Sequence, residues 1–218
     1  MDNLTLIIPA KNESESLPKV LEDLSKYNFK INIILEKEDI NTINSIKFFK
    51  NYKLIYQNGK GFGDALIQGI KETDTKYFCI FNADGSFNPK EILDFIKLLE
   101  EKNVDFVFAS RYQKNSGSED DTILTYIGNK IFTLLGKFLF RLPITDILYT
   151  FVVGITQKVK KLNLEKKDFS FCVEFPIKAK KNKMTMISAS SYERKRIGGK
   201  KKVNEFRDGF LILIQMII

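Results

Sequence analysis

Short apolar runs alternate with amphipathic stretches along the first half of the chain. The apolar runs predict buried strands at residues 4–8, 31–36, 53–57, 77–81 and 104–109. The stretches between them predict helices at residues 17–27, 40–50, 64–71 and 88–102. Strands that alternate with helices predict a doubly wound, mostly parallel α/β sheet. Ligands in such sheets bind beyond the carboxyl ends of the strands, so the residues just after each strand are the candidates for chemistry.

The second half of the chain has a different pattern. A polar loop at residues 115–121 precedes a long apolar stretch at 123–142, which predicts a helix. Its charges, Lys130, Lys137 and Arg141, fall on one narrow stripe, which is typical of an interfacial helix with snorkelling cations. A helix packed on the sheet with one wet edge fits the same pattern. The apolar tail at 210–218 is too short to cross a bilayer and would lie in the interface or dock on a partner.

The 218 residues suffice for one α/β domain, and the net charge of +8 suits an anionic partner. Nucleic acid, a membrane surface and a phosphorylated substrate are such partners, while a lysine-rich composition alone would give the same charge. The segment 178–202 carries ten basic residues and a single acidic one, Glu193. Its glycine pair between cations could fold over a phosphate. Because few aromatic residues beyond Tyr192 accompany these cations, we expect no nucleic-acid partner.

The sequence contains no histidine, which removes histidine-based triads and histidine metal ligands. Its two cysteines, Cys79 and Cys172, belong to no CxxC pair, so neither a zinc site nor a disulfide framework is expected. Any acid, base or ligand is then a carboxylate, an amide, a lysine, a tyrosine or the backbone.

Asp84 directly follows the strand predicted at 77–81. That strand delivers a carboxylate to the carboxyl edge of the sheet, where it could bind a hard divalent cation shared with a diphosphate. An aspartate in an ordinary turn is the alternative. The glycine cluster at 59–63 matches neither the Walker A nor the dinucleotide-binding spacing. It could open a helix that receives an anion, or it could make a tight turn.

Several short motifs, in this order, resemble the family 2 glycosyltransferases of the GT-A fold. The resemblance is to the polyprenyl-phosphate sugar transferases, the group that includes dolichol-phosphate mannose synthase. The motifs span nearly the whole chain and lie at residues 8–13, 61–65 with Gly69, 82–85, 110–112, 171–174, and 196–199 with 202–203. Each motif is weak alone, but their order is specific.

The resemblance implies roles on the donor side. Pro9, Lys11 and Glu13 would line the nucleotide pocket, and Glu36 stands where the family has an aspartate that reads the base. Contacts to the donor diphosphate would come from Asn82, Ala83 and Asp84, with Arg111, Arg196 and Lys202 neutralising donor or acceptor phosphates. Asp84 would be the catalytic residue and, with Asn82 and Ser86, would bind Mg²⁺ or Mn²⁺. Asn82 departs from the family's Asp-x-Asp, and residues 36–39 depart from its Asp-Asp-Gly-Ser.

The resemblance also implies an inverting transfer from a UDP- or GDP-linked sugar to a polyprenyl phosphate. Asp146, Glu174 and Arg194 would lie on the acceptor side, although residues 146–151 depart from the family pattern. A lipid phosphate is already anionic, so no strong base is needed. A glycan or lipid hydroxyl acceptor would need one, and Glu174 or Asp146 would be the candidate. The third possibility is a non-catalytic protein that binds a nucleotide sugar or is recruited to a membrane.

On this interpretation, residues 1–218 form one glycosyltransferase domain. Residues 1–114 would be its nucleotide-sugar-binding half, and 115–218 its acceptor- and membrane-facing half. We expect a cytoplasmic protein, peripheral to the cytoplasmic face of the membrane. The sequence specifies no oligomeric state.

Overall fold

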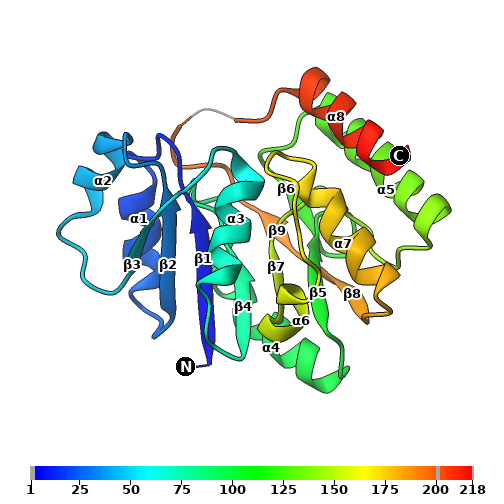
Figure 1. Ribbon diagram of the computed structural model, residues 1–218, viewed down its shortest axis with the longest axis horizontal. Coiled ribbons are helices and arrows are strands. Elements are labelled where there is room, and N and C mark those ends of the chain that lie inside the picture. The colour runs from blue at the N-terminus through cyan, green and yellow to red at the C-terminus, as the bar shows by residue number, and fades with distance from the viewer. Residues whose placement is uncertain (1–2, 200–201, 218) are drawn as a thin grey trace.

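Figure 1 shows the computed structural model, which describes residues 3–199 and 202–217. Lys200, Lys201 and Ile218, which belong to the predicted basic segment and apolar tail, lie outside the described residues. The strands are β1 (Leu4–Pro9), β2 (Lys30–Leu35), β3 (Lys53–Tyr56), β4 (Tyr77–Ile80), β5 (Phe106–Ser110), β6 (Gly117–Ser118), β7 (Val152–Ile155), β8 (Met186–Ser190) and β9 (Tyr192–Glu193). The helices are α1 (Leu17–Leu24), α2 (Ile40–Ile46), α3 (Phe62–Lys71), α4 (Glu91–Glu101), α5 (Ile123–Phe140), α6 (Thr156–Lys160), α7 (Phe171–Lys181) and α8 (Glu205–Ile217).

The central sheet has the strand order β3-β2-β1-β4-β7-β5-β8. β1 pairs in parallel with β2 and with β4, so that Ile7 lies opposite Asn32 on one side and Ile80 on the other. The predicted mostly parallel α/β sheet is therefore confirmed. β7 lies antiparallel between β4 and β5, an insertion that the sequence pattern does not predict. It also brings the two halves of the chain into one sheet.

Each face of the sheet is covered by its own hydrophobic core, because side chains alternate along each strand. On β1, Leu6 and Ile8 face the core that is shared with α1 and α4, whereas Ile7 faces the core shared with α3, α7 and α8. Both cores draw residues from both halves of the chain. The sheet is thereby held rigid, and the loops beyond its carboxyl ends have a fixed base.

The glycine cluster makes a tight turn that lets another loop pack closely. Gly61 has a φ of +106° and precedes α3 directly. A Cβ on Gly61 or Gly63 would lie 2.2 or 2.1 Å from carbonyl oxygens of the loop that precedes α7. The amide of Asp64 donates to one of these, the carbonyl of Lys167, at 3.1 Å. These contacts favour the tight-turn interpretation, because the start of α3 is filled by the protein itself.

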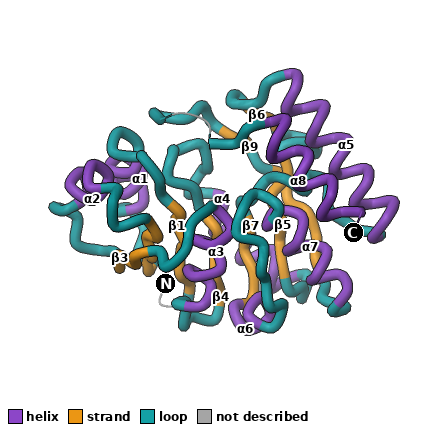
Figure 2. The backbone as a smooth tube through the Cα atoms, turned by 45° about the horizontal axis from the view of Figure 1, so that its top comes forward, coloured by secondary structure: helices purple, strands orange, loops and turns teal. Residues whose placement is uncertain are grey.

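α5 buries small and polar residues and leaves large apolar side chains exposed. Figure 2 shows α5 and α8 side by side at one end of the molecule, and α7 lies beneath them. The buried residues of α5 are Asn129, Thr133 and Gly136, whereas Leu134 and Phe138 are 67% and 83% exposed. By length and composition, α5 is apolar enough to cross a membrane, which alone is weak evidence. This exposure contradicts the alternative of a helix packed on the sheet with only one wet edge.

We call the exposed apolar side chains of these two helices the apolar platform. On both helices they recur about one turn apart, so they form a stripe on each. The platform consists of Ile123, Leu124, Ile127, Ile131, Leu134, Phe138 and Leu139 of α5 and Phe206, Phe210, Ile214 and Ile217 of α8.

Candidate active site

A sharp turn at residues 82–86 follows β4 and carries the carboxylate of Asp84. Gly85 has a φ of +85°, a conformation that favours glycine, and the amide of Ser86 donates to Asp84 Oδ1 at 3.0 Å. The Asp84 side chain is 18% exposed, so its other oxygen remains within reach of a ligand. We refer to this segment as the donor turn.

Asn82 and Ser86 stabilise the donor turn from within. The Asn82 amide nitrogen donates to Ser86 Oγ, and Asn82 Oδ1 accepts from the amide of Phe87 at 3.4 Å. Ser86 and Ala83 are buried. The three predicted metal ligands thus lie together, with Asp84 as the only charged one among them. Mg²⁺ in proteins is often held by one or two carboxylates plus phosphate oxygens and water, and this donor set fits such a site. Among the described residues, no group of three or more Asp, Glu or Cys side chains is arranged to hold a metal alone.

The basic segment lies directly against the donor turn. The amide of Ile197 donates to the Asp84 carbonyl at 2.8 Å, and the amide of Arg194 donates to the Ser86 carbonyl at 2.8 Å. A Cβ on Gly85 would lie 2.4 Å from the Cδ1 atom of Ile197. Gly85 therefore serves twice, because it allows the positive φ and leaves room for Ile197. Two segments that are far apart in the sequence form one wall of the site.

Arg196 and Lys202 bring positive charge to this edge of the sheet. Arg196 Nη1 lies 3.7 Å from Asp84 Oδ2, and Lys202 Nζ lies 3.0 Å from Glu13 Oε1. The hydrogen bond from Arg196 to Asp120 is the main cause that raises the pKa of this arginine. The two cations thus lie beside carboxylates of the loops that follow β4 and β1.

The predicted nucleotide-binding residues follow β1 and β2 at the same edge. Glu13 is buried and accepts from Ser16 Oγ at 2.7 Å, which orients its carboxylate. Lys11 Nζ and Glu36 Oε1 form an ion pair at 2.9 Å, which joins the loop after β1 to the loop after β2. Pro9 ends β1. The structure thus brings the loops after β1, β2 and β4 to one edge, with the predicted donor residues on them.

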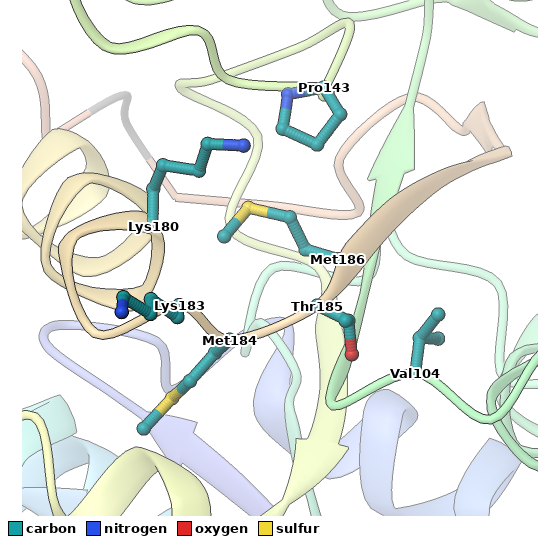
Figure 3. A pocket seen from close by; sticks show the side chains of 7 residues that line it. All are labelled: Val104, Pro143, Lys180, Lys183, Met184, Thr185 and Met186. Atoms are coloured by element: carbon teal, nitrogen blue, oxygen red, sulfur yellow. The ribbon is translucent and has the colours of Figure 1, made fainter.

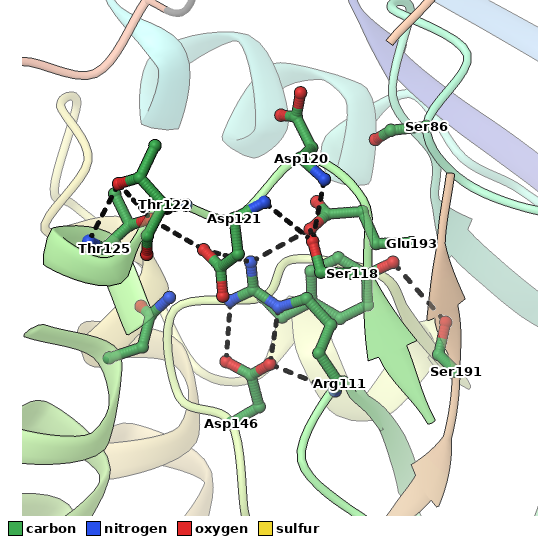
Figure 4. Close-up of polar contacts among 12 residues, drawn as sticks. Ser86, Arg111, Ser118, Asp120, Asp121, Thr122, Thr125, Asp146, Ser191 and Glu193 are labelled. Atoms are coloured by element: carbon green, nitrogen blue, oxygen red, sulfur yellow. Dashed lines mark hydrogen bonds and ion pairs between the residues drawn. The ribbon is translucent and has the colours of Figure 1, made fainter. Parts of the chain in front are cut away.

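Arg111 is in a different environment from the one expected. Its guanidinium binds Asp146 through Nε at 2.7 Å and Nη2 at 3.0 Å, and its Nη1 lies 3.2 Å from Glu193 and 3.5 Å from Asp121 (Figure 4). It also lies over the Tyr149 ring, 4.5 Å from the centroid. Burial alone would lower the pKa of Arg111, but the nearby carboxylates raise it well above its usual value. Carboxylates of the protein therefore surround the Arg111 guanidinium, and the Arg111 side chain is only 8% exposed.

The predicted acceptor residues also have protein partners. Asp146 is fully buried against Arg111. Glu174 is 2% exposed, accepts from the amides of Glu165 and Lys166 at 2.8–3.1 Å, and pairs with Lys178 Nζ at 2.8 Å.

Arg194 donates to a carbonyl oxygen at the end of the donor turn. Its Nη2 lies 2.6 Å from the carbonyl oxygen of Phe87, and its Nη1 lies 3.8 Å from Asp23. The structure therefore puts Arg194 beside the donor turn, whereas Glu174 fixes the loop before α7.

One pocket lies beside Arg111, and another lies at the opposite edge of the sheet. One, of about 350 Å³, lies at the start of α5 and is lined by Arg111, Tyr112, Gly117, Ser118, Asp121, Thr122, Ile123 and Tyr126. The other, of about 540 Å³, is lined by Val104, Pro143, Lys180, Lys183, Met184, Thr185 and Met186 (Figure 3). Val104 precedes β5 and Thr185 precedes β8, so the pocket opens at the amino edge of the sheet, opposite the donor turn. We assign it no part in the site.

Sequence reasoning selected Asp84 and Asp146 but missed three other acidic residues around Arg111 and Arg196. Asp120 and Asp121 lie in a loop that only its polarity marks, and Glu193 stands out only as the lone acid of the basic segment. Burial raises the pKa of Glu193, while Arg111 lowers it. A contact between residues 82 positions apart leaves no trace in local spacing, so the sequence has no signal for it.

Comparison with known proteins identifies the family. The model of "Glycosyl transferase family 2" matches residues 5–162. The chain belongs to this family. This glycosyltransferase is 26% identical over 206 residues to the UDP-N-acetylglucosamine–dolichyl-phosphate N-acetylglucosaminyltransferase of Methanococcus voltae, a match that covers 83% of this chain and 81% of that protein. Family membership confirms the predicted family and the prediction of an enzyme, against the non-catalytic alternative.

Solved structures confirm the GT-A fold. The glucosyl-3-phosphoglycerate synthase of Mycobacterium tuberculosis, crystallised with Mn²⁺, UDP and phosphoglyceric acid, superposes with a TM-score of 0.74. Its sequence is 12% identical, and the match covers 99% of the glycosyltransferase and 78% of that chain. The mannosyl-3-phosphoglycerate synthase of Rubrobacter xylanophilus superposes with a TM-score of 0.70 at 13% identity. That match covers 99% of the glycosyltransferase and 72% of the Rubrobacter chain.

Proposed function

We propose that this glycosyltransferase transfers a sugar from a nucleoside-diphosphate donor to a polyprenyl phosphate at a membrane surface. The dolichyl-phosphate acceptor in the name of the Methanococcus voltae relative supports the acceptor class, at 26% identity. The Mycobacterium tuberculosis enzyme was crystallised with Mn²⁺ and UDP, which supports a metal ion and a nucleotide as ligands of the present glycosyltransferase.

On the donor side, Pro9, Lys11, Glu13 and Glu36 would contact the nucleoside. The diphosphate would lie over the donor turn, between Asp84 and the cations Arg196 and Lys202. Mg²⁺ or Mn²⁺ would be held by Asp84, with Asn82 and Ser86 beside it, and would stabilise charge on the departing nucleoside diphosphate. Asn82 binds other turn residues, so Asp84 and the diphosphate would supply the charged ligands. Arg111 would organise the site rather than bind a phosphate, since carboxylates surround it.

We favour a phosphate over a hydroxyl as the acceptor because Glu174 and Asp146, the two candidate bases, are buried. A hydroxyl acceptor must lose its proton to a base as the new bond forms, whereas a phosphate is already ionised. Both candidate bases are buried, and both are bound to cations or amide groups of the protein. An acceptor hydroxyl could reach neither carboxylate without breaking these contacts. A polyprenyl phosphate requires no such base.

The apolar platform and the pocket at the start of α5 suit the two parts of this acceptor. The isoprenoid chain, together with the membrane that holds it, would lie along the exposed apolar side chains of α5 and α8. Lys130 lies over the rings of Tyr112 and Tyr126, which line the pocket, 4.3 and 5.4 Å from their centroids. It could therefore attract the phosphate to the end of the platform nearer Arg111.

A pair of matched acceptors tests this proposal. The enzyme would be incubated with radiolabelled UDP- and GDP-sugars, with Mn²⁺ or Mg²⁺, and with either a polyprenyl phosphate or the corresponding polyprenol. We expect an acid-labile glycolipid from the phosphate and none from the alcohol. The variant Asp84→Ala should lose this transfer. Transfer to the polyprenol would instead favour the hydroxyl-acceptor alternative, and undiminished transfer by Asp84→Ala would disprove the role of this carboxylate.

A further inference from the structure

Residues 117–120 of the polar loop are joined to the basic segment by a series of contacts. Within it, β6 pairs in parallel with β9, and the amide of Glu119 donates to the Glu193 carbonyl at 2.9 Å. The amide of Lys195 in turn donates to Glu119 Oε2 at 3.3 Å. Ser118 Oγ accepts from the amides of Asp120 and Asp121 at 3.1 and 2.9 Å. The backbone at Asp120 is therefore held in one position relative to the segment that carries Arg196.

Arg196 lies between two carboxylates that hold it differently. Asp120 accepts from Arg196 Nε at 3.0 Å and also from Nη2, which is a bidentate arrangement. Asp84 approaches from the other side, where a single pair of atoms lies 3.7 Å apart. Bidentate pairing fixes the plane of a guanidinium as well as its position. The orientation of Arg196 is thus set by Asp120 rather than by Asp84.

This difference matters for the donor site. A guanidinium that closed on Asp84 would occupy the oxygen that is otherwise available to a metal ion. It would also turn its donors away from the diphosphate. Arg196 and Asp84 are both less than one quarter exposed, so solvent screens their attraction only in part. Asp84 is the other carboxylate with which Arg196 forms an ion pair, so it is the partner toward which Arg196 would move if Asp120 lost its charge.

We propose that Asp120 is a positioning residue, which holds the Arg196 guanidinium beside the donor turn and keeps it from closing on Asp84. The inference deepens the proposed function, because it rests on the donor site described above. It adds to that site a carboxylate from the loop at residues 117–121, which sequence reasoning did not select. On this proposal, Asp120 acts through Arg196 and not by contact with the donor or the metal.

A double-mutant cycle on nucleotide binding tests the proposal. Dissociation constants for UDP and for GDP, each with Mn²⁺, would be measured by calorimetry for the wild type, Asp120→Asn, Arg196→Gln and the double variant. We expect Asp120→Asn to weaken binding about tenfold, the size of one charge-assisted contact. In the Arg196→Gln background the same change should cause no further loss. An equal loss in both backgrounds, or none in either, would overturn the proposal.

Glu119→Gln is the matched control, because it removes the same charge from the same loop, while the glutamine keeps an oxygen that can accept from the amide of Lys195. It should leave nucleotide affinity within about twofold of the wild type, well below the tenfold that marks a strong contact. Thermal unfolding of every variant checks that each is folded at the temperature of the binding assay. A loss in Glu119→Gln as large as in Asp120→Asn would indicate a general effect of loop charge, contrary to the proposal.

A second measurement needs no nucleotide. The Nε–H resonance of Arg196 would be assigned by its absence in Arg196→Gln, and its exchange with water followed by NMR. We expect slow exchange in the wild type and fast exchange in Asp120→Asn. Equal exchange in both would overturn the positioning role. If the wild type binds neither UDP nor GDP, the proposed donor site fails, whereas the NMR comparison still decides whether Asp120 holds Arg196.

Discussion

Replacing Glu174 with glutamine separates two roles that this residue could have. As a general base it would be required for transfer and could be lost without great effect on the fold. In the structure it is instead a buried anchor for the loop before α7, with the amides of Glu165 and Lys166 and the ammonium of Lys178 as its partners. The substitution keeps the size of the side chain and removes its charge. It therefore changes electrostatics and hydrogen bonding with little change in packing.

The expected cost follows from these contacts. Hydrogen bonds to a charged group contribute about 1.5–3 kcal/mol each, and a glutamine keeps one acceptor oxygen while it turns an NH₂ group toward amide donors. Loss of the ion pair with Lys178 adds to this, since that pair is largely shielded from water. We expect the free energy of unfolding to fall by about 2–4 kcal/mol. For a domain of this size, the melting temperature would fall by roughly 5–12 °C.

Thermal unfolding and initial rates, measured on the same preparations well below the melting temperature, test this prediction. We expect Glu174→Gln to melt earlier and to keep its kcat within a few-fold of the wild type. The control is Glu165→Gln, since that side chain is 78% exposed and should cost little. An unchanged melting temperature together with a loss of kcat of a hundredfold or more would refute the anchor role. It would restore Glu174 as a base for a hydroxyl acceptor.

Three further predictions concern the donor turn and the platform. Asp84→Asn should abolish the Mn²⁺-dependent part of UDP or GDP binding, measured by calorimetry, while the melting temperature without ligand stays within a few degrees of the wild type. Gly85→Ala should lower the free energy of unfolding by about 1–3 kcal/mol in denaturant titrations, because of its positive φ and its contact with Ile197, and the added change Ile197→Ala should recover part of that loss. The double variant Leu134→Glu with Phe138→Glu should reduce co-sedimentation with anionic lipid vesicles by at least about tenfold, because both side chains are exposed on the platform. Nucleotide binding should stay unchanged, because neither side chain belongs to the proposed donor site. Full sedimentation of this variant would argue against the platform as the membrane-binding surface.

The local sequence pattern predicts the first half of the fold well. Each apolar run in the first half is a strand, and the boundaries differ by a few residues at helix ends, as at Leu24, where α1 ends before the predicted Tyr27. The strands and helices between residues 143 and 190 were not predicted. β7 is a short run of buried residues whose direction depends on pairing with β4 and β5, and α7 contains Pro176, which is uncommon in a helix interior. Such elements form because tertiary contacts outweigh local preference.

What the sequence by itself determined is which residues follow the strands at the carboxyl edge of the sheet. A carboxylate that follows a buried strand must emerge at the carboxyl edge of the sheet, so the place of Asp84 at the same edge as Glu13 follows from the order of elements. Whether a charge is available to a ligand depends on what surrounds it, and only the tertiary structure decided this. Arg111 is enclosed by Asp121, Asp146 and Glu193, whereas Arg196 stays beside the donor turn. Coulomb interactions act across space rather than along the chain, so the partners of these arginines could be known only once the chain was folded.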